Sequence, residues 1–428
     1  MATVRLDLSK REKAIKPMHA GGQPPVTSNA SDVFFHYLTE AGIPYSRLHD
    51  VGGAFGGGKY VDIPNIFRDF SADENDPASY DFAFTDLLIN QLVKAKVEPY
   101  YRLGVTIENA AHVKSYFIDP PKDPAKWARI CEHIIRHYTE GWADGFHHKI
   151  TYWEIWPEPD GKFNQLWTGT KEEFFNFYHI VSTHLKAKFP HLKFGTFGSH
   201  GFYAMVGGGY PWSKDASVTQ YFIDFFHAFM EYIKKNGTPL DFFTWHSYAP
   251  TSYVLKMDKW LHEQLEAYGY GELETHLNEW DPYFEELGTG HHAAELAAMM
   301  IGMQHGYTDM CCIYDMRTAN APFCPLFNPI THKPIHGYYS MVAFNTLYQL
   351  GTQVLSECDT DELYVLAATD GERHAMLISN LTGEKQELCI EGADLYDARY
   401  HVIDNERMLS WSPAVSKIDK NTVLLIEW

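Results

Sequence analysis

The sequence predicts an α/β fold: a (β/α)8 TIM barrel followed by a C-terminal β-sandwich domain. A chain of 428 residues with 45% apolar residues has room for one large domain and a smaller companion. From about residue 30 to 335, short β-rich runs alternate with longer helix-like stretches, as in barrel proteins. Beyond residue 350 the pattern changes to short strands separated by turn dipeptides such as Asp370-Gly371 and Thr382-Gly383.

The barrel strands are short runs rich in β-branched and aromatic residues. We expect them at residues 15–20, 44–50, 97–106, 150–156, 192–198, 240–248, 274–280 and 310–315. The helices show helical periodicity and terminal signals, such as the N-cap residue Ser31. We expect them at residues 31–41, 80–95, 124–141, 171–189, 218–235, 255–268, 291–305 and 338–350. A doubly wound sheet is the rival, but the long regular alternation without a nucleotide-binding fingerprint favours the barrel.

Three units follow from this pattern. Residues 1–14 hold an N-terminal strand that we expect to join the β-sandwich, residues 15–350 form the barrel, and residues 351–428 form the accessory sandwich. The expected sandwich strands are 363–369, 374–381, 386–390, 400–403 and 422–428.

Net charge and composition limit the classes of molecule that the protein can be expected to bind. Asp and Glu number 55 against 35 Lys and Arg, a formal net charge of −20, which argues against nucleic acid or an anionic membrane as the main partner. The 15% aromatic content suits a protein that holds sugar rings against flat apolar faces. We therefore expect an oligosaccharide or small glycoside as the partner; a homo-oligomer stays open.

No cofactor, metal or secretory signal is expected. The glycine run 52–58 and Lys59 nearly match a phosphate loop, but Tyr60 occupies the Ser/Thr position. A metal-dependent barrel hydrolase or isomerase is poorly supported, because no His-x-His motif ends the first strand. The six cysteines are scattered without a CxxC pair, and no apolar stretch follows the basic N-terminal residues, so we expect a cytoplasmic protein.

Two carboxylates stand at strand ends. Glu158 follows the fourth expected strand and Glu279 ends the seventh, so both should face each other across the C-terminal mouth, where barrel active sites lie. Cleavage of a glycosidic bond needs such a pair: one acid that protonates the leaving oxygen and one carboxylate that attacks the anomeric carbon. The apolar aromatic setting should help the acid to keep its proton.

The period-2 rule predicts which neighbours share the inner face. On each strand, alternate residues should point inward with the glutamates; these are Tyr45, Arg47 and His49; Glu154, Trp156 and Glu158; Phe242, Thr244, His246 and Tyr248; Leu277 and Glu279. An inward Arg47 needs a counter-charge, and Glu154 is the obvious partner.

At these residues the chain resembles glycoside hydrolase family 39, the β-xylosidase and α-L-iduronidase family within clan A of (β/α)8 retaining glycosidases. The resemblance rests on YSRLHD at 45–50, YWEIWPEP at 152–159, FTWHSY at 243–248 and LNEW at 277–280. It implies that Glu158 is the acid/base and Glu279 the nucleophile. It also implies that His49, His246, Tyr248 and Asp315 bind the sugar.

One departure from the family pattern concerns substrate binding. The family has Asn before the acid/base, where its amide binds the sugar 2-hydroxyl, and this chain has Pro157. Asn278 is one candidate to supply the lost contact, and Trp280 and Phe284 are candidates to line the pocket.

The sequence thus predicts a retaining, exo-acting glycoside hydrolase that cleaves a terminal sugar, with a β-xyloside as the first choice. An arabinoside, galactoside or uronide is the alternative substrate. A catalytically impaired sugar-binding barrel is the alternative function.

Overall fold

The central unit is a closed parallel barrel. The computed structural model describes residues 1–25, 34–51, 61–106, 118–161, 166–208, 215–282, 286–318 and 323–428. The barrel strands, in hydrogen-bonded order, are β2 (Ala20–Gly22), β3 (Tyr45–Leu48), β4 (Glu98–Leu103), β5 (Tyr152–Ile155), β6 (Lys193–Ser199), β7 (Phe242–Ser247), β8 (Glu274–Trp280) and β9 (Met310–Ile313). Closure of β9 onto β2 confirms the predicted barrel and excludes the doubly wound sheet.

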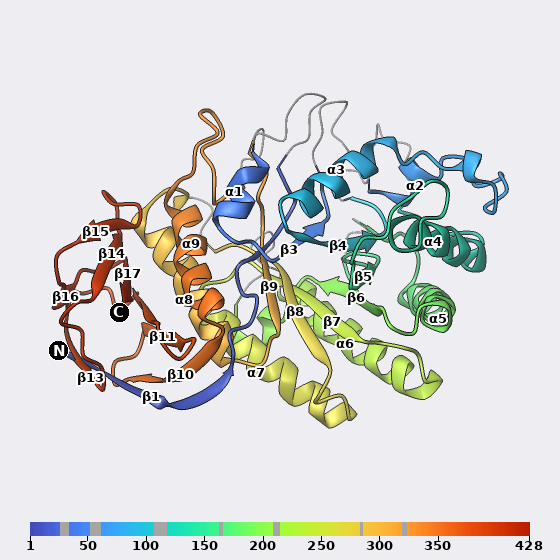
Figure 1. The fold of residues 1–428 in the computed structure, drawn as a ribbon. Coiled ribbons are helices and arrows are strands. Elements are labelled where there is room, and N and C mark those ends of the chain that lie inside the picture. The colour runs from blue at the N-terminus through green and yellow to red at the C-terminus, as the bar shows by residue number, and fades with distance from the viewer. Residues whose placement is uncertain are drawn as a thin grey trace.

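Helices surround the barrel, close to their predicted positions (Figure 1). They are α1 (Phe35–Glu40), α2 (Ile63–Ile66), α3 (Ala83–Lys94), α4 (Pro124–Thr139), α5 (Lys171–Lys188), α6 (Ala216–Asn236), α7 (Thr251–Tyr268), α8 (Gly290–His305) and α9 (His336–Leu350), with 3-10 turns at Pro77–Ser79 and Tyr203–Val206. Local signals set the ends: a capping box of Thr170 and Glu173 starts α5. The predicted cap Ser31 and the glycine run 52–58 lie outside the described residues. No helix in the described ranges is long and apolar enough to cross a membrane.

The first barrel strand differs from its prediction. We expected it at 15–20, but β2 is only Ala20–Gly22. Its two glycines hide the strand from a hydrophobicity pattern, yet the first of them is required by close packing. A Cβ on Gly21 would lie 2.3 Å from the Met316 sulfur. The close approach of the chain after β9 therefore requires a glycine at this position of the strand.

The remaining strands form one curled, nine-stranded mixed sheet. Its order is β15-β14-β17-β12-β11-β10-β1-β13-β16. The strands are β1 (Ala2–Ala14), β10 (Thr352–Cys358), β11 (Leu363–Thr369), β12 (His374–Asn380), β13 (Gln386–Glu391), β14 (Arg399–Ile403), β15 (Ser410–Ser412), β16 (Lys417–Ile418) and β17 (Thr422–Glu427). Strand β1 runs antiparallel to β10 and parallel to β13, so the N-terminal segment lies inside the C-terminal sheet.

The sheet has two apolar faces. One encloses a core of its own, which includes Val4, Val354 and Leu424. The other face, which includes Leu377 and Leu425, joins the main core of the barrel domain. In Figure 1 the sheet stands beside α8 and α9, on the side of the barrel away from α4 and α5. The sheet thus covers this helix pair at the side of the barrel.

Candidate active site

The two predicted carboxylates meet at the mouth of the barrel. Glu158 lies three residues beyond the end of β5, and Glu279 is the second-last residue of β8. One oxygen of each carboxylate and one ring nitrogen of His246 lie within 4.8 Å of one another. Both glutamates are buried, with 6% and 7% of their surface exposed. Residues 121 positions apart in the sequence therefore share one small, nearly dry site.

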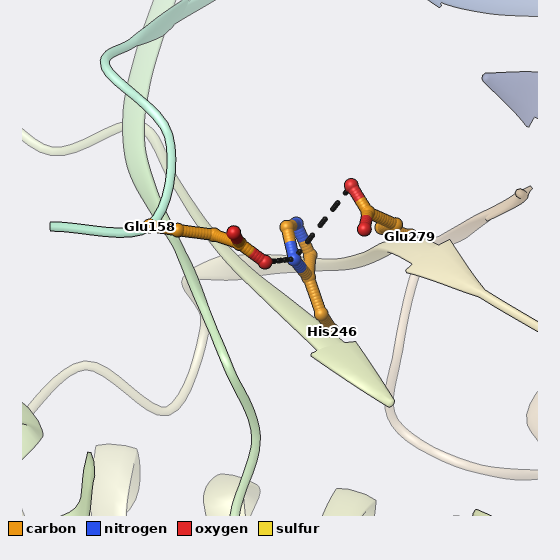
Figure 2. Close-up of side chains that lie close together, drawn as sticks. All are labelled: Glu158, His246 and Glu279. Atoms are coloured by element: carbon orange, nitrogen blue, oxygen red, sulfur yellow. Dashed lines mark hydrogen bonds and ion pairs between the residues drawn. The ribbon is translucent and has the colours of Figure 1, made fainter. Parts of the chain in front are cut away.

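His246 bridges the two glutamates (Figure 2). Its Nδ1 lies 2.7 Å from Glu158 Oε1 and 3.8 Å from Glu279 Oε2. Two further donors fix Glu279: Arg47 Nη1 donates to Oε2 at 3.0 Å, and the Tyr248 hydroxyl donates to Oε1. The guanidinium and the phenol thus fix the orientation of this carboxylate, as an attacking group requires.

A third carboxylate forms the floor of the site. Glu154 is fully buried and accepts hydrogen bonds from Arg47 Nε at 2.8 Å, Thr244 Oγ1 at 2.9 Å and Asn278 Nδ2 at 2.8 Å. The predicted pairing of Arg47 with Glu154 is confirmed. Burial disfavours the charge of Arg47, but Glu154 and Glu279 outweigh this and raise its pKa. The guanidinium thus links the floor to the nucleophile candidate.

Alternation along β7 and the residue that follows it agrees with the prediction. Thr244 reaches Glu154, His246 reaches Glu158, and Tyr248, just after the strand, reaches Glu279. All three side chains therefore face the interior, two residues apart, as the period of a strand requires.

Alternation fails at the two strands that carry the glutamates. The pairing of β8 shifts register between Leu277 and Trp280, so Asn278 and Glu279 both reach inward. On β5, Trp156 does not share the inner face with Glu154. Its backbone turns into the left-handed region at φ 62°, and its indole contacts rings of α4 and α5 and donates to the Leu166 carbonyl. Such strained conformations cluster at functional sites.

Electrostatics at Glu158 differ from the expectation. Burial raises its pKa, but His200, the hydrogen bond from His246 and the charge of Arg47 outweigh burial and lower the pKa to about 2. The expected apolar aromatic surroundings are absent from this carboxylate's described contacts because Trp156 turns away. The ring of His200 lies 3.5 Å from Glu158 Oε2 and 2.8 Å from Asp160.

The sequence reasoning missed His200 and Asp160. One signal could have found them: each stands just beyond the end of a barrel strand, on the same rim as the glutamates. Because β5 and β6 are adjacent in the barrel, a histidine after β6 and an aspartate after β5 can be expected to lie close together.

The other predicted site residues are placed as follows. His49 is buried with its Nε2 3.5 Å from Asp50, and burial holds its pKa well below the usual value. Asp315 is buried and paired with Arg317 at 2.7 Å.

Of the three candidates for pocket contacts, the structure describes Asn278 and Trp280. Asn278 donates its amide to Glu154, below the glutamate pair. Trp280 has no exposed surface and belongs to the hydrophobic core, whereas we expected a pocket wall. Phe284 lies outside the described residues.

The same groups match the ligand types of a metal site. Glu158, His246 and Glu279 each offer one ligand atom to the cluster. However, the facing oxygens already accept hydrogen bonds from His246 and Arg47. A cation would compete with the guanidinium for the same carboxylate, so this donor set does not fit a metal ion well.

A family assignment follows from the sequence profile of glycosyl hydrolases family 39, which matches residues 36–300. The chain belongs to this family. The matched range includes β3 to β8 and therefore both glutamates, Arg47, His246 and Tyr248.

Two β-xylosidases are similar in sequence. That of Geobacillus stearothermophilus is 23% identical over 220 residues, which cover 49% of this chain and 39% of that enzyme. That of Caldicellulosiruptor saccharolyticus is 26% identical over 244 residues, 55% of this chain and 42% of that enzyme. The chain thus matches less than half the length of either relative.

Solved structures share the fold over nearly the whole chain. A glucosidase of Croceicoccus marinus superposes with a TM-score of 0.78 at 19% identity, over 100% of this chain and 98% of that chain. A monomeric β-xylosidase of Caulobacter crescentus gives 0.70 at 15% identity, over 99% of both chains. At these identities the likeness establishes the fold: a barrel joined to a curled sheet.

Proposed function

We propose that the protein is a retaining glycoside hydrolase with Glu158 as acid/base and Glu279 as nucleophile. One observation carries this proposal: oxygens of the two buried carboxylates lie within 4.8 Å across the barrel mouth. Retaining glycosidases keep their two carboxyl groups about 5–5.5 Å apart, and inverting enzymes leave room for a water between them. The short separation favours direct attack by one carboxylate.

The proposed reaction has two steps. Glu279, held by Arg47 and Tyr248, attacks the anomeric carbon while Glu158 protonates the leaving oxygen. The resulting glycosyl ester on Glu279 is then hydrolysed by a water that Glu158 deprotonates. The floor around Glu154 keeps Arg47 charged and aimed at the nucleophile throughout.

The proposed substrate is a terminal β-xyloside, cleaved by exo action. The support is the family match together with two β-xylosidase relatives. Arabinosides, galactosides and uronides are the alternatives that an aryl glycoside panel would separate.

Replacing Glu279 tests the nucleophile. In Glu279→Gln we expect hydrolysis of an aryl β-xyloside to fall by at least about 10³-fold, because the ester can no longer form. A 2-fluoro-xyloside should label the wild-type protein on Glu279, as peptide mass spectrometry would show. Undiminished hydrolysis by the variant would remove Glu279 from the mechanism. The matched control is Glu263→Gln on α7, whose exposed carboxylate lies far from the site in an i,i+4 pair.

Replacing Glu158 tests the acid/base. In Glu158→Gln, substrates with poor leaving groups should lose much more rate than activated aryl xylosides, since only the former need protonation. Azide should restore turnover of activated substrates through a β-glycosyl azide of retained configuration. Equal losses on both substrate types would argue against the acid role.

A second candidate function is sugar binding without turnover. It is favoured by Pro157, which lacks the side-chain amide that the family places before the acid/base. Calorimetric binding of xylose or xylobiose, with no hydrolysis across the aryl glycoside panel, would select this function.

A further inference from the structure

A buried acid–imidazole pair lies behind Glu158, and the reaction as proposed does not use it. His200, at the end of β6, has 4% of its surface exposed, and Asp160, in the turn after β5, has none. His200 Nδ1 lies 2.8 Å from Asp160 Oδ1, and its Nε2 lies 3.5 Å from Glu158 Oε2. The ring stacks on Phe222 of α6 at 5.0 Å. The imidazole therefore connects two carboxylates in a fixed orientation.

Asp160 is held as an acceptor. Its Oδ2 accepts from Ser199 Oγ at 2.9 Å and from the His200 backbone N–H at 3.2 Å, which leaves Oδ1 for the imidazole. Because an ionised carboxylate only accepts, His200 must carry a proton on Nδ1. Its Nε2 then either donates to an ionised Glu158 or accepts from a protonated one. One proton can thus sit on either side of this contact.

The surrounding charges favour the proton on the imidazole. The charged groups that act on His200 are Glu158 and Asp160 after β5 and Glu279 on β8, and its ring packs on Phe222 of α6. Tyr203 before α6, Tyr221 on α6 and His246 on β7 are the titratable groups around these carboxylates. Burial lowers the pKa of His200, but the carboxylates of Glu158, Asp160 and Glu279 outweigh burial and raise it to about 9. The same contact contributes to the low pKa of Glu158. At neutral pH the proton shared by His200 Nε2 and Glu158 therefore lies mostly on the imidazole.

We propose that Asp160 and His200 form a positioning pair that stores the proton of the acid/base Glu158 and returns it at each turnover. This inference rests on the proposed function. In the first step, the Nε2–H bond of His200 breaks as an O–H bond forms on Glu158, which passes its proton to the leaving oxygen. In the second step, Glu158 takes a proton from the attacking water and the imidazole takes it back. Protons balance over the cycle, and Asp160 takes no part in the transfer.

The pH profile of kcat/KM for an aryl β-xyloside tests the proposal. In the wild type, activity should persist until His200 loses its proton, near pH 9. In His200→Asn, Glu158 alone must hold the proton, so the alkaline limb should move to lower pH by at least about one unit. Asp160→Asn should move it in the same direction, because the carboxylate that raises the pKa of His200 is gone. The matched control is His184→Asn on α5, which breaks a partly exposed His–Glu pair and should leave the profile unchanged.

An alkaline limb that stays in place in folded His200→Asn or Asp160→Asn protein would overturn the inference. Histidine ring NMR gives a second readout that needs no activity, with the His200 signal assigned by its loss in His200→Asn. A wild-type titration near pH 9 that falls by about one unit or more in Asp160→Asn supports proton storage. A wild-type titration below pH 7 contradicts it, even if one variant fails to fold. An inactive wild type on the whole glycoside panel would instead defeat the proposed function.

Discussion

The buried ion pair of Arg47 and Glu154 at the floor of the site allows a direct test of how much this charge pairing stabilises the protein. In Glu154→Gln, Arg47 loses one of its two counter-charges while it remains fully buried. Removing one partner of a buried ion pair costs about 3–5 kcal/mol. Because Arg47 keeps Glu279 at 3.0 Å, we expect the lower end, about 3 kcal/mol. At roughly 2 °C per kcal/mol for a large domain, Tm should fall by about 6 °C.

Thermal unfolding followed by circular dichroism measures this change. The control is Glu263→Gln, which removes an exposed pair on α7 with 54% and 67% exposed side chains. Exposed pairs contribute about 0–1 kcal/mol, so its Tm should move by less than about 2 °C. If Glu154→Gln unfolds within about 1 °C of the wild type, the charge balance around Arg47 is not what stabilises the floor.

Three shorter predictions concern other contacts. Tyr248→Phe removes a charge-assisted hydrogen bond to Glu279, worth about 1.5–3 kcal/mol, so kcat/KM on an aryl β-xyloside should fall about 10- to 150-fold; an unchanged value would mean that the phenol does not orient the nucleophile. Gly21→Ala should destabilise the protein in urea by about 1–3 kcal/mol through overpacking against Met316, whereas Gly22→Ala meets only a carbonyl oxygen at 3.5 Å and should cost less; equal costs would refute the packing argument. Activity should survive dialysis against EDTA, since donors already occupy the facing carboxylate oxygens; its loss and recovery with a divalent metal would restore the metal alternative.

The barrel could be predicted because its strands and helices repeat strong local signals. The ranges 171–189 and 274–280 agree with α5 and β8 to within one residue, and a capping box marks the start of α5. Strand β2 could not be found this way, because Gly21 is required by the close approach of Met316, which lies much later in the sequence, after the neighbouring strand β9. Strand β10 was also missed; it follows α9 almost directly, and its Gln, Ser and Glu residues weaken the apolar pattern.

The site was predictable where strands stay regular. Thr244, His246 and Tyr248 follow a simple alternation, and their contacts agree with it. The bulge in β8 and the left-handed turn at Trp156 break that period, and both depend on the closed barrel rather than on local sequence. Whether Glu158 and Glu279 react as proposed stays a prediction for the variants above.

The partnership of β1 with β13 has a consequence for biosynthesis. Residues 2–5 pair in parallel with residues 388–391, so the whole barrel is synthesised between the two partners of this pairing. At 5–20 residues per second, the ribosome needs roughly 20–80 s to make the chain between them. During that interval the whole barrel can form, and β10 can pair with one edge of β1 while the edge that meets β13 stays open. Until β13 is made, the open edge of β1 can pair with another chain, so this is the period in which we expect aggregation or chaperone binding.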